Sequence, residues 1–348
     1  MQAVQWFGPG DIQVQTLPSP ERQAARDAIL RVTCSAICGT DLHPYRGEIP
    51  DFMVGTVMGH EFTGIIEDID SAITHLRPGD RVVASDIIAC GQCWYCQRGW
   101  HYQCMHVSLF GYGTVVGPYV PGGQAEFVRV PFADVVLAKI PDTLTDEQVL
   151  FAGDILATGF MAVEAAQVQP GATVAVVGCG PVGLFAIQSA YMLGASRVLA
   201  IDPDQQRQAA ARQAGAHALP YDDHLIEQIR AITSGRGADA VVEAVGSEAA
   251  LTLALATARP RGIVVAVGAH HAKAMPFSSQ SAFSRELTLK FVVGDPINAR
   301  DRIFPLLETG RLNSTQIISH RLPLAQAKAA YALFDRHEAV KVLLLPEA

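Results

Sequence analysis

Hydrophobic and polar residues alternate over short stretches of the first 130 residues, and Pro and Gly separate these stretches. A period of two indicates strands with one face on a core and the other face toward water. The first part of the chain is therefore predicted to be mostly β. The strands predicted in this way lie at residues 3–6, 12–15, 28–34, 62–69, 80–84 and 122–130.

The pattern changes after residue 171, where short continuous apolar runs alternate with stretches of helical character. Continuous apolar strands are typical of parallel sheets that are covered on both faces. We therefore predict a doubly wound sheet of about six parallel strands with crossover helices. The apolar runs lie at residues 173–177, 198–202, 241–246, 262–268 and 287–294.

The C-terminal tail is too short to form a domain. After Gly294 only 54 of the 348 residues remain, and a segment of that length rarely builds its own core. Its pattern predicts helices at residues 299–309 and 324–335 and a strand at residues 340–345. We therefore expect the tail to complete the N-terminal domain. The expected domains are 1–155 with 295–348, and 156–294.

Composition narrows the classes of function. The formal net charge is −8 and no Lys/Arg cluster is found, which argues against nucleic acid or an anionic membrane as partner. No apolar run approaches the roughly 18 residues that span a bilayer. The N-terminus lacks the basic start and apolar segment of a signal peptide. Seven cysteines, four of them in one cluster, indicate metal chemistry in a reducing cytoplasm.

Two potential zinc ligands lie close together near residue 40. Cys38 opens the run Cys-Gly-Thr-Asp-Leu-His, and His60 followed by Glu61 comes shortly afterwards. A thiolate and a neutral imidazole form a ligand pair that suits zinc, although a catalytic zinc usually has three protein ligands. Either residue alone is also explained by a buried thiol or a core histidine. Asp41 is the candidate for orienting His60 by accepting its second N–H.

A second cysteine cluster has the spacing C-x2-C-x2-C-x7-C. Four neighbouring thiolates satisfy one tetrahedral zinc and leave no position open, as in structural zinc sites. An iron–sulfur cluster is the alternative, although the bacterial ferredoxin run has a shorter last gap and a following Pro. Unliganded thiols or disulfides are the third possibility. The four residues are Cys90, Cys93, Cys96 and Cys104, in a lobe at about residues 88–106.

A glycine-rich motif follows the first strand of the predicted parallel sheet. It has the G-x-G-x-x-G pattern, a strand before it, a helix after it and an acid 19 residues past its last Gly. In this context the glycines let the backbone approach a pyrophosphate at the helix N-terminus. The motif residues are Gly178, Gly180, Pro181, Val182 and Gly183.

The acid that follows the glycine motif predicts the choice of dinucleotide. Asp202 can accept hydrogen bonds from the ribose hydroxyls of NAD, and its charge disfavours the 2′-phosphate of NADP. Arg207 complicates this prediction, because a nearby guanidinium can offset a phosphate. We expect NAD. Val245 and Val267, at the ends of two later strands, are expected to line the nicotinamide side.

These motifs together resemble those of the zinc-dependent medium-chain alcohol dehydrogenases. The resemblance implies a GroES-like β-rich catalytic domain and a Rossmann domain, with homodimers or homotetramers. It also implies that Asp154 is the third ligand of the catalytic zinc, although a helix cap is an alternative reading. In this family Glu61 either coordinates zinc in some states or lies beside it, and Lys341 matches a basic residue that reaches the pyrophosphate.

The expected reaction is reversible hydride transfer between an alcohol and NAD. Zinc acts as the Lewis acid. Thr40, two residues past Cys38, and His43, three residues further, are expected to relay the proton. The expected cofactors are two zinc ions per chain and NAD.

The expected substrate is a short or medium primary or secondary alcohol, diol or polyol. Formaldehyde dehydrogenase/dismutase-like, threonine and polyol dehydrogenase activities are alternatives within the same class. A zinc-free quinone reductase is a further enzymatic alternative. A non-enzymatic dinucleotide or zinc sensor is the alternative from another class of function.

Overall fold

The computed structural model describes residues 1–270 and 277–346. The chain forms two compact units, Met1–Asp154 with Asp295–Ala348, and Ile155–Gly294. The first unit is thus discontinuous in sequence.

The first unit is built on three antiparallel or mixed sheets. Its largest sheet has the order β10-β6-β5-β3-β18-β17, with β9 also paired to β3, and the smaller sheets are β2-β1-β4 and β7-β8. The strands are β1 (Gln2–Gly8), β2 (Asp11–Thr16), β3 (Ala28–Ala36), β4 (Thr56–Val57), β5 (Glu61–Ile69), β6 (Arg81–Ala84), β7 (Ile87–Ile88), β8 (Ser108–Leu109), β9 (Phe127–Val130), β10 (Leu137–Lys139), β17 (His320–Pro323) and β18 (Val342–Leu345).

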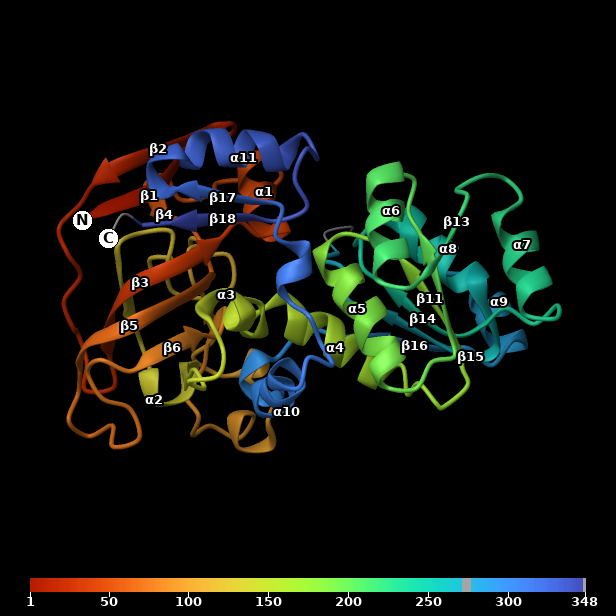
Figure 1. The fold of residues 1–348 in the computed structure, drawn as a ribbon, viewed down its shortest axis with the longest axis horizontal. Helices are drawn as coiled ribbons and strands as arrows, with labels where there is room; N and C mark the ends of the chain where they lie inside the picture. The colour runs from red at the N-terminus through yellow and green to blue at the C-terminus, as the bar shows by residue number, and fades with distance from the viewer. Residues whose placement is uncertain (271–276, 347–348) are drawn as a thin grey trace. The chain divides into compact units, whose positions relative to one another are not determined.

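The helices of the first unit are short. α11 packs against β2 (Figure 1). Its buried face joins a core cluster that includes Tyr331 and Val4. The helices are α1 (Gly39–Tyr45), α2 (Ala133–Val136), α3 (Asp146–Val149), α10 (Pro296–Glu308) and α11 (Ala327–Asp335), with the 3₁₀ helices η1 (Cys96–Arg98), η2 (His101–Gln103), η3 (Leu150–Gly153), η4 (Thr315–Ile317) and η5 (Leu324–Gln326).

The tail completes the largest sheet of the first unit. β18 pairs antiparallel with β3, where Leu344 lies opposite Ser35, and β17 pairs parallel with β18. The predicted strand at residues 340–345 corresponds to β18. β17 was not predicted, because its sequence His-Arg-Leu-Pro has neither a continuous apolar run nor a clear alternation.

The second unit is a six-stranded parallel sheet with the order β13-β12-β11-β14-β15-β16, which confirms the predicted doubly wound sheet. The strand order reverses between β11 and β14, the place where ligands bind in such sheets. The strands are β11 (Thr173–Val177), β12 (Arg197–Ile201), β13 (His217–Leu219), β14 (Ala238–Glu243), β15 (Ala258–Ala266) and β16 (Thr288–Phe291). β13 has only three residues and gave no apolar run to recognise.

Several helices of the second unit pack against this sheet. α5 and α6 contact each other, as do α7 and α8, and Figure 1 shows α5 and α6 in front of the strands. Several of these helices have a side-chain N-cap. For example, the Asp204 side chain accepts hydrogen bonds from the N–H groups of Gln206 and Arg207 at the start of α6. The helices are α4 (Ile155–Ala165), α5 (Pro181–Met192), α6 (Gln205–Gln213), α7 (Leu225–Ile232), α8 (Glu248–Thr257) and α9 (Ser279–Ser284).

No single helix in the described part of the chain is long and apolar enough to cross a membrane. Only a bent pair, Asp146–Gly153 with Ile155–Ala165, has sufficient length and apolar composition when both parts are taken together.

Candidate active site

The structure brings Cys38, His60 and Asp154 together within the first unit. Cys38 precedes α1, His60 precedes β5, and Asp154 follows η3, so three separate segments meet. Cys38 Sγ lies 3.5 Å from Asp154 Oδ2, and His60 Nε2 lies 3.4 Å from the same oxygen. All three side chains are buried. One potential ligand atom from each lies within 4.8 Å of the others.

These separations fit a zinc ion. Bonds of about 2.3 Å to sulfur and about 2.0 Å to oxygen, at a tetrahedral angle, place the two ligand atoms about 3.5 Å apart. The same geometry places nitrogen and oxygen ligands about 3.3 Å apart. The distances to Asp154 Oδ2 are 3.5 Å and 3.4 Å. A thiolate, an imidazole and a carboxylate thus stand where one zinc would bind all three.

The pKa values of Cys38, His60 and Asp154 indicate that a positive charge between them is favourable. Burial and the charge of Asp154 together raise the pKa of the Cys38 thiol to about 11. Burial lowers the pKa of His60, but Asp41 and Cys38 outweigh burial and raise it well above its usual value. Burial raises the pKa of Asp154, but the hydrogen bond from His60 and its charge outweigh burial and lower it. A metal ion bound by these residues would therefore displace the protons of Cys38 and His60.

Asp41 lies next to His60, and its role in orienting the His60 ring stays a prediction. Its Oδ1 is 3.4 Å from His60 Nδ1, and its Oδ2 accepts from the N–H of Cys38 at 2.9 Å and from Gln124 Nε2 at 3.2 Å. Tyr331 in turn donates its hydroxyl to Gln124 at 2.8 Å. The side chain of Asp41 is thus fixed on one ligand and directed at another.

Gly59 makes room for this arrangement. Its φ is +98°, and a Cβ there would lie 2.4 Å from Gln124 Cγ. Only glycine therefore lets the chain enter β5 with His60 against Asp41. The contributions of Gln124 and Tyr331 were not predicted, because neither residue lies within a motif that marks a metal site.

Glu61 forms a buried ion pair with Lys341. The Nζ and Oε2 atoms lie 2.5 Å apart, and both side chains are 0% exposed. Burial raises the pKa of Glu61 to about 7, although Lys341 opposes this. Burial lowers the pKa of Lys341, but the Glu61 carboxylate outweighs burial and raises it. The structure thus gives Lys341 a partner that the sequence did not predict, and its contact with a pyrophosphate stays a prediction.

Thr40 and His43 both lie on α1, three residues apart and hence on one face. His43 Nδ1 lies 2.6 Å from Glu48 Oε2, and its side chain is 22% exposed. Glu48 therefore orients the ring of His43, whereas the proton relay through Thr40 and His43 stays a prediction.

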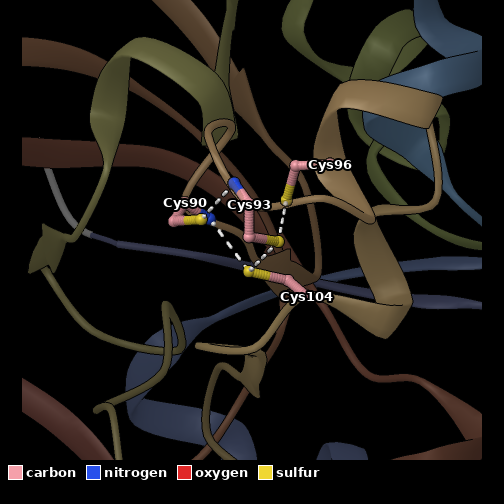
Figure 2. A group of neighbouring side chains, drawn as sticks. All are labelled: Cys90, Cys93, Cys96 and Cys104. Carbon is pink, nitrogen blue, oxygen red and sulfur yellow. Dashed lines mark hydrogen bonds between the residues drawn. The ribbon is translucent and has the colours of Figure 1, made fainter.

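The four clustered cysteines point toward one another (Figure 2). One Sγ from each lies within 4.8 Å of the others, with 3.5 Å from Cys93 to Cys96 and 3.9 Å from Cys93 to Cys104. Four thiolates around one zinc lie about 3.8 Å apart, given bonds of about 2.3 Å. Backbone N–H groups of Cys96 and Met105 lower the pKa of Cys93 to about 6. The arrangement fits a single tetrahedral ion.

The glycine motif connects β11 to α5. A Cβ on Gly183 would lie 1.9 Å from the carbonyl oxygen of Gly178, so the helix and the strand can pack this closely only with glycine. A Cβ on Gly180 would meet no atom within 4 Å, and this residue is the N-cap of α5, with Pro181 and Val182 in the first turn. Gly180 thus leaves open space at a helix N-terminus, which suits a pyrophosphate.

Asp202 follows β12 and is 3% exposed. Its Oδ2 accepts from the N–H of Cys179 at 2.8 Å, and its Oδ1 accepts from the N–H of Asp204 at 2.9 Å. Arg207 Nη1 lies 3.8 Å from Asp202 Oδ2. The carboxylate therefore shapes the glycine loop itself, and each oxygen keeps a second lone pair for a ribose hydroxyl.

Val245 and Val267 follow β14 and β15, which are neighbouring strands, so both lie at the same edge of the sheet. The buried Glu243 accepts from the N–H groups of Val245 and Gly246, both at 2.7 Å, and its other oxygen lies 2.9 Å from His270 Nε2. Glu243 holds the loop in which the nicotinamide-side residues were predicted. This role was not predicted, since Glu243 lies within the apolar run at residues 241–246 and no motif marks it.

Two family models match the chain. Residues 24–142 match the alcohol dehydrogenase GroES-like domain, and residues 181–308 match the zinc-binding dehydrogenase domain. A zinc-binding dehydrogenase of Sinorhizobium meliloti 1021 that was solved bound to NADP has a TM-score of 0.86 and is 29% identical, with 99% of both chains covered.

Two relatives match the chain along its length. The zinc-type alcohol dehydrogenase-like protein AdhB of Bacillus subtilis strain 168 is 35% identical, with 99% of this chain and 100% of AdhB covered. The alcohol dehydrogenase TADH of Thermus sp. ATN1 is 42% identical, with 100% of both chains covered and a TM-score of 0.96. With the two domains matched and relatives of this similarity, the chain belongs to the zinc-dependent alcohol dehydrogenases of the medium-chain dehydrogenase/reductase superfamily.

Proposed function

We propose that the protein is an NAD-dependent alcohol dehydrogenase that interconverts an alcohol and its carbonyl compound by hydride transfer. The observation that carries the proposal is the group formed by Cys38, His60 and Asp154, whose atoms are spaced as zinc ligands. Zinc held by these three residues supplies a Lewis acid that lowers the pKa of an alcohol hydroxyl. Three protein ligands leave the fourth position open for substrate, as catalytic zinc sites do.

A second zinc has a structural role in the proposal. Cys90, Cys93, Cys96 and Cys104 would hold it, and four thiolates leave no position for substrate. The lobe around them has a small core of its own, made largely of the cysteines themselves. Binding of zinc there would therefore contribute directly to the stability of this lobe.

NAD is the proposed hydride acceptor, bound at the glycine motif. Asp202 supports NAD over NADP, because its negative charge would meet a 2′-phosphate. NADP is the alternative cofactor, for two reasons. One relative was solved bound to NADP, and the guanidinium of Arg207 lies 3.8 Å from Asp202. The preference is measured by comparing the rates of wild type and Asp202→Ser with NAD and with NADP at equal concentration. We expect wild type to prefer NAD and the variant to shift toward NADP.

The proton released from the alcohol needs an acceptor within the protein. Thr40 is proposed to contact the substrate oxygen, and His43 to pass the proton on; Glu48 beside His43 supports a fixed ring orientation. Imidazole suits this role because its pKa lies near neutrality. Glu61, next to His60, is proposed to influence the metal from its buried ion pair with Lys341.

The proposal is tested with purified protein and a panel of alcohols, aldehydes and ketones, following NADH absorbance. We expect turnover that disappears when zinc is removed by a chelator and returns when zinc is added back. Thr40→Val should lower kcat strongly and leave zinc content unchanged. Equal turnover in the metal-free protein would contradict the proposal.

We further propose a homo-oligomer, with four copies favoured over two, that resides in the cytoplasm. Family resemblance supports the oligomer, and the free thiols of all described cysteines support a reducing compartment. Light scattering on the purified chain measures the assembly directly. A monomeric mass at micromolar concentration would contradict the oligomer.

A further inference from the structure

Asp86 is a buried carboxylate that no sequence motif singled out. It lies close to the metal group, by which we mean Cys38, His60 and Asp154. Its side chain follows β6 and is 9% exposed. Its N–H donates to the carbonyl of Gly153 at 2.8 Å, and its own carbonyl accepts from the N–H of Phe110 at 3.2 Å. The backbone is therefore fixed on both sides, and one side is the peptide that precedes the metal ligand Asp154.

Among the residues that the structure describes, no Lys, Arg or His lies within ion-pair distance of the Asp86 carboxyl, unlike the other buried carboxylates. Within residues 1–270 and 277–346, every other buried Asp or Glu has a Lys, Arg or His within ion-pair distance. The hydrogen-bond partners of the Asp86 carboxyl are the Ser85 hydroxyl at 3.4 Å and the N–H of Ile87. A buried carboxyl without a cation is unfavourable for folding, so such a group often serves binding or catalysis.

The carboxyl of Asp86 interacts electrostatically with Asp154 and His60 but is not one of the potential metal ligands. Burial raises its pKa well above the usual range, the charge of Asp154 raises it further, and His60 lowers it. Its oxygens are not among the ligand atoms that lie within 4.8 Å of one another. The partly buried phenol of Tyr102 interacts with the same three residues. Asp86 therefore lies within electrostatic range of the reacting centre but is not placed as a ligand.

We propose that Asp86 is a specificity-determining residue that accepts a hydrogen bond from a second polar group of the substrate. The preferred substrate then carries a hydroxyl or an ammonium on the carbon beside the reacting carbinol. This inference rests on the proposed function. A binding site that hydrogen-bonds a polar group of its substrate strongly rejects an analogue that lacks this group. An apolar pocket discriminates much less between substrates that differ by one methylene. Here a simple alcohol would leave the buried carboxyl of Asp86 without a hydrogen-bond partner from the substrate.

The substrate comparison uses 2-butanol, 2,3-butanediol and 3-amino-2-butanol, which differ only at the neighbouring carbon. We expect wild type to have a kcat/KM at least about tenfold higher for one of the two bifunctional alcohols than for 2-butanol, the size of a lost hydrogen bond to a charged group. Asp86→Leu should abolish this preference.

Asp86→Asn distinguishes the two polar groups. Its amide oxygen still accepts from a hydroxyl but carries no charge, so a preference for the diol should persist in part and a preference for the ammonium should disappear. The variant is also similar in size to wild type, so it remains informative if Asp86→Leu fails to fold. Asp80→Asn removes another buried carboxylate, one that is paired with Lys139, and should keep the wild-type ratio of rates.

A binding measurement separates this inference from the proposed function. Pinacol and 2,3-dimethyl-2-butanol differ by one hydroxyl, and neither can be oxidised because the carbinol carbon has no hydrogen. Calorimetry should show at least about tenfold tighter binding of pinacol to wild type but not to Asp86→Leu, at equal zinc content. This result would support the inference even if no alcohol were oxidised, which would refute only the proposed function.

The inference is overturned if wild type oxidises 2-butanol as efficiently as both bifunctional alcohols and binds both tertiary alcohols equally. It is also overturned if the preference survives in both Asp86 variants, because another residue would then supply the hydrogen bond.

Discussion

Lys341 and Glu61 face each other in the interior of the first unit, 280 positions apart in sequence, with nitrogen and oxygen 2.5 Å apart and neither side chain exposed. The ring of Phe151 lies beneath the ammonium, 5.4 Å from Nζ to its centroid. This contact fixes the C-terminal tail to the residue that follows the proposed zinc ligand His60.

Breaking this pair on one side should destabilise the protein more than removing both partners. We expect Lys341→Met to lower the free energy of unfolding by about 3–5 kcal/mol, because it leaves a buried carboxylate without a cation. The double variant with Glu61→Leu should recover most of that loss. Denaturant titrations of the single and double variants measure the difference, and equal losses in all of them would contradict a buried ion pair.

The glycine motif offers a matched pair of substitutions. Gly183→Ala should prevent normal folding of the second unit, because its Cβ would lie 1.9 Å from the carbonyl oxygen of Gly178. Gly180→Ala has room within the protein and should leave the melting temperature unchanged. Its methyl group would occupy the space proposed for the pyrophosphate, so the Kd for NADH should rise on the order of tenfold. Fluorescence titration with NADH checks this, and unchanged affinity in Gly180→Ala would place the dinucleotide elsewhere.

Asp80 provides a pH-dependent contribution to stability. Burial raises its pKa, but hydrogen bonds from Lys139 and from the N–H of Arg77 outweigh burial and lower it. Because the folded pKa is lower than the unfolded one, the contribution is present above the unfolded pKa and is lost as pH falls through the folded value. At neutral pH, Asp80→Asn should lower the free energy of unfolding by about 1–2 kcal/mol.

The difference between wild type and Asp80→Asn should shrink below about pH 4. Glu67→Gln is the control, since it removes a carboxylate from an exposed ion pair with Arg31 and should change stability by less than about 1 kcal/mol. A stability difference for Asp80→Asn that stays constant from neutral to strongly acid pH would show that its charge is not responsible.

Zinc binding at the catalytic group should depend on pH. Without metal, the Cys38 thiol has a pKa of about 11 and His60 a pKa well above its usual value, so zinc must displace protons from both. Affinity should therefore fall steeply as pH is lowered, by up to about a hundredfold per pH unit when both protons compete. Equilibrium dialysis of wild type and Cys38→Ala isolates the catalytic zinc by difference. Affinity that does not change with pH would contradict thiolate and imidazole ligation.

Sequence reasoning found the features that depend on short-range signals. The residues around Cys38 and His60, the four clustered cysteines and the glycine motif each fit a known chemistry at a fixed spacing. The parallel sheet followed from its apolar runs, and β13 was missed because three residues give no periodicity.

Features that depend on long-range contacts could not be predicted. The partner of Glu61 lies at residue 341, and Gln124 and Tyr331 reach Asp41 from two other segments. Asp86 looked like an ordinary residue after a strand, and its distinguishing feature is burial with no cation nearby among the described residues. Such roles arise from desolvation and charge in the folded chain, which no local pattern records.

The central claim is that Cys38, His60 and Asp154 hold a zinc that turnover requires. Counting zinc per chain by metal analysis, alongside alcohol oxidation, tests it most directly. We predict two zinc ions in wild type, and one zinc with negligible turnover in Cys38→Ala and in Asp154→Ala. An Asp154→Ala protein that keeps two zinc ions and full activity would contradict the account.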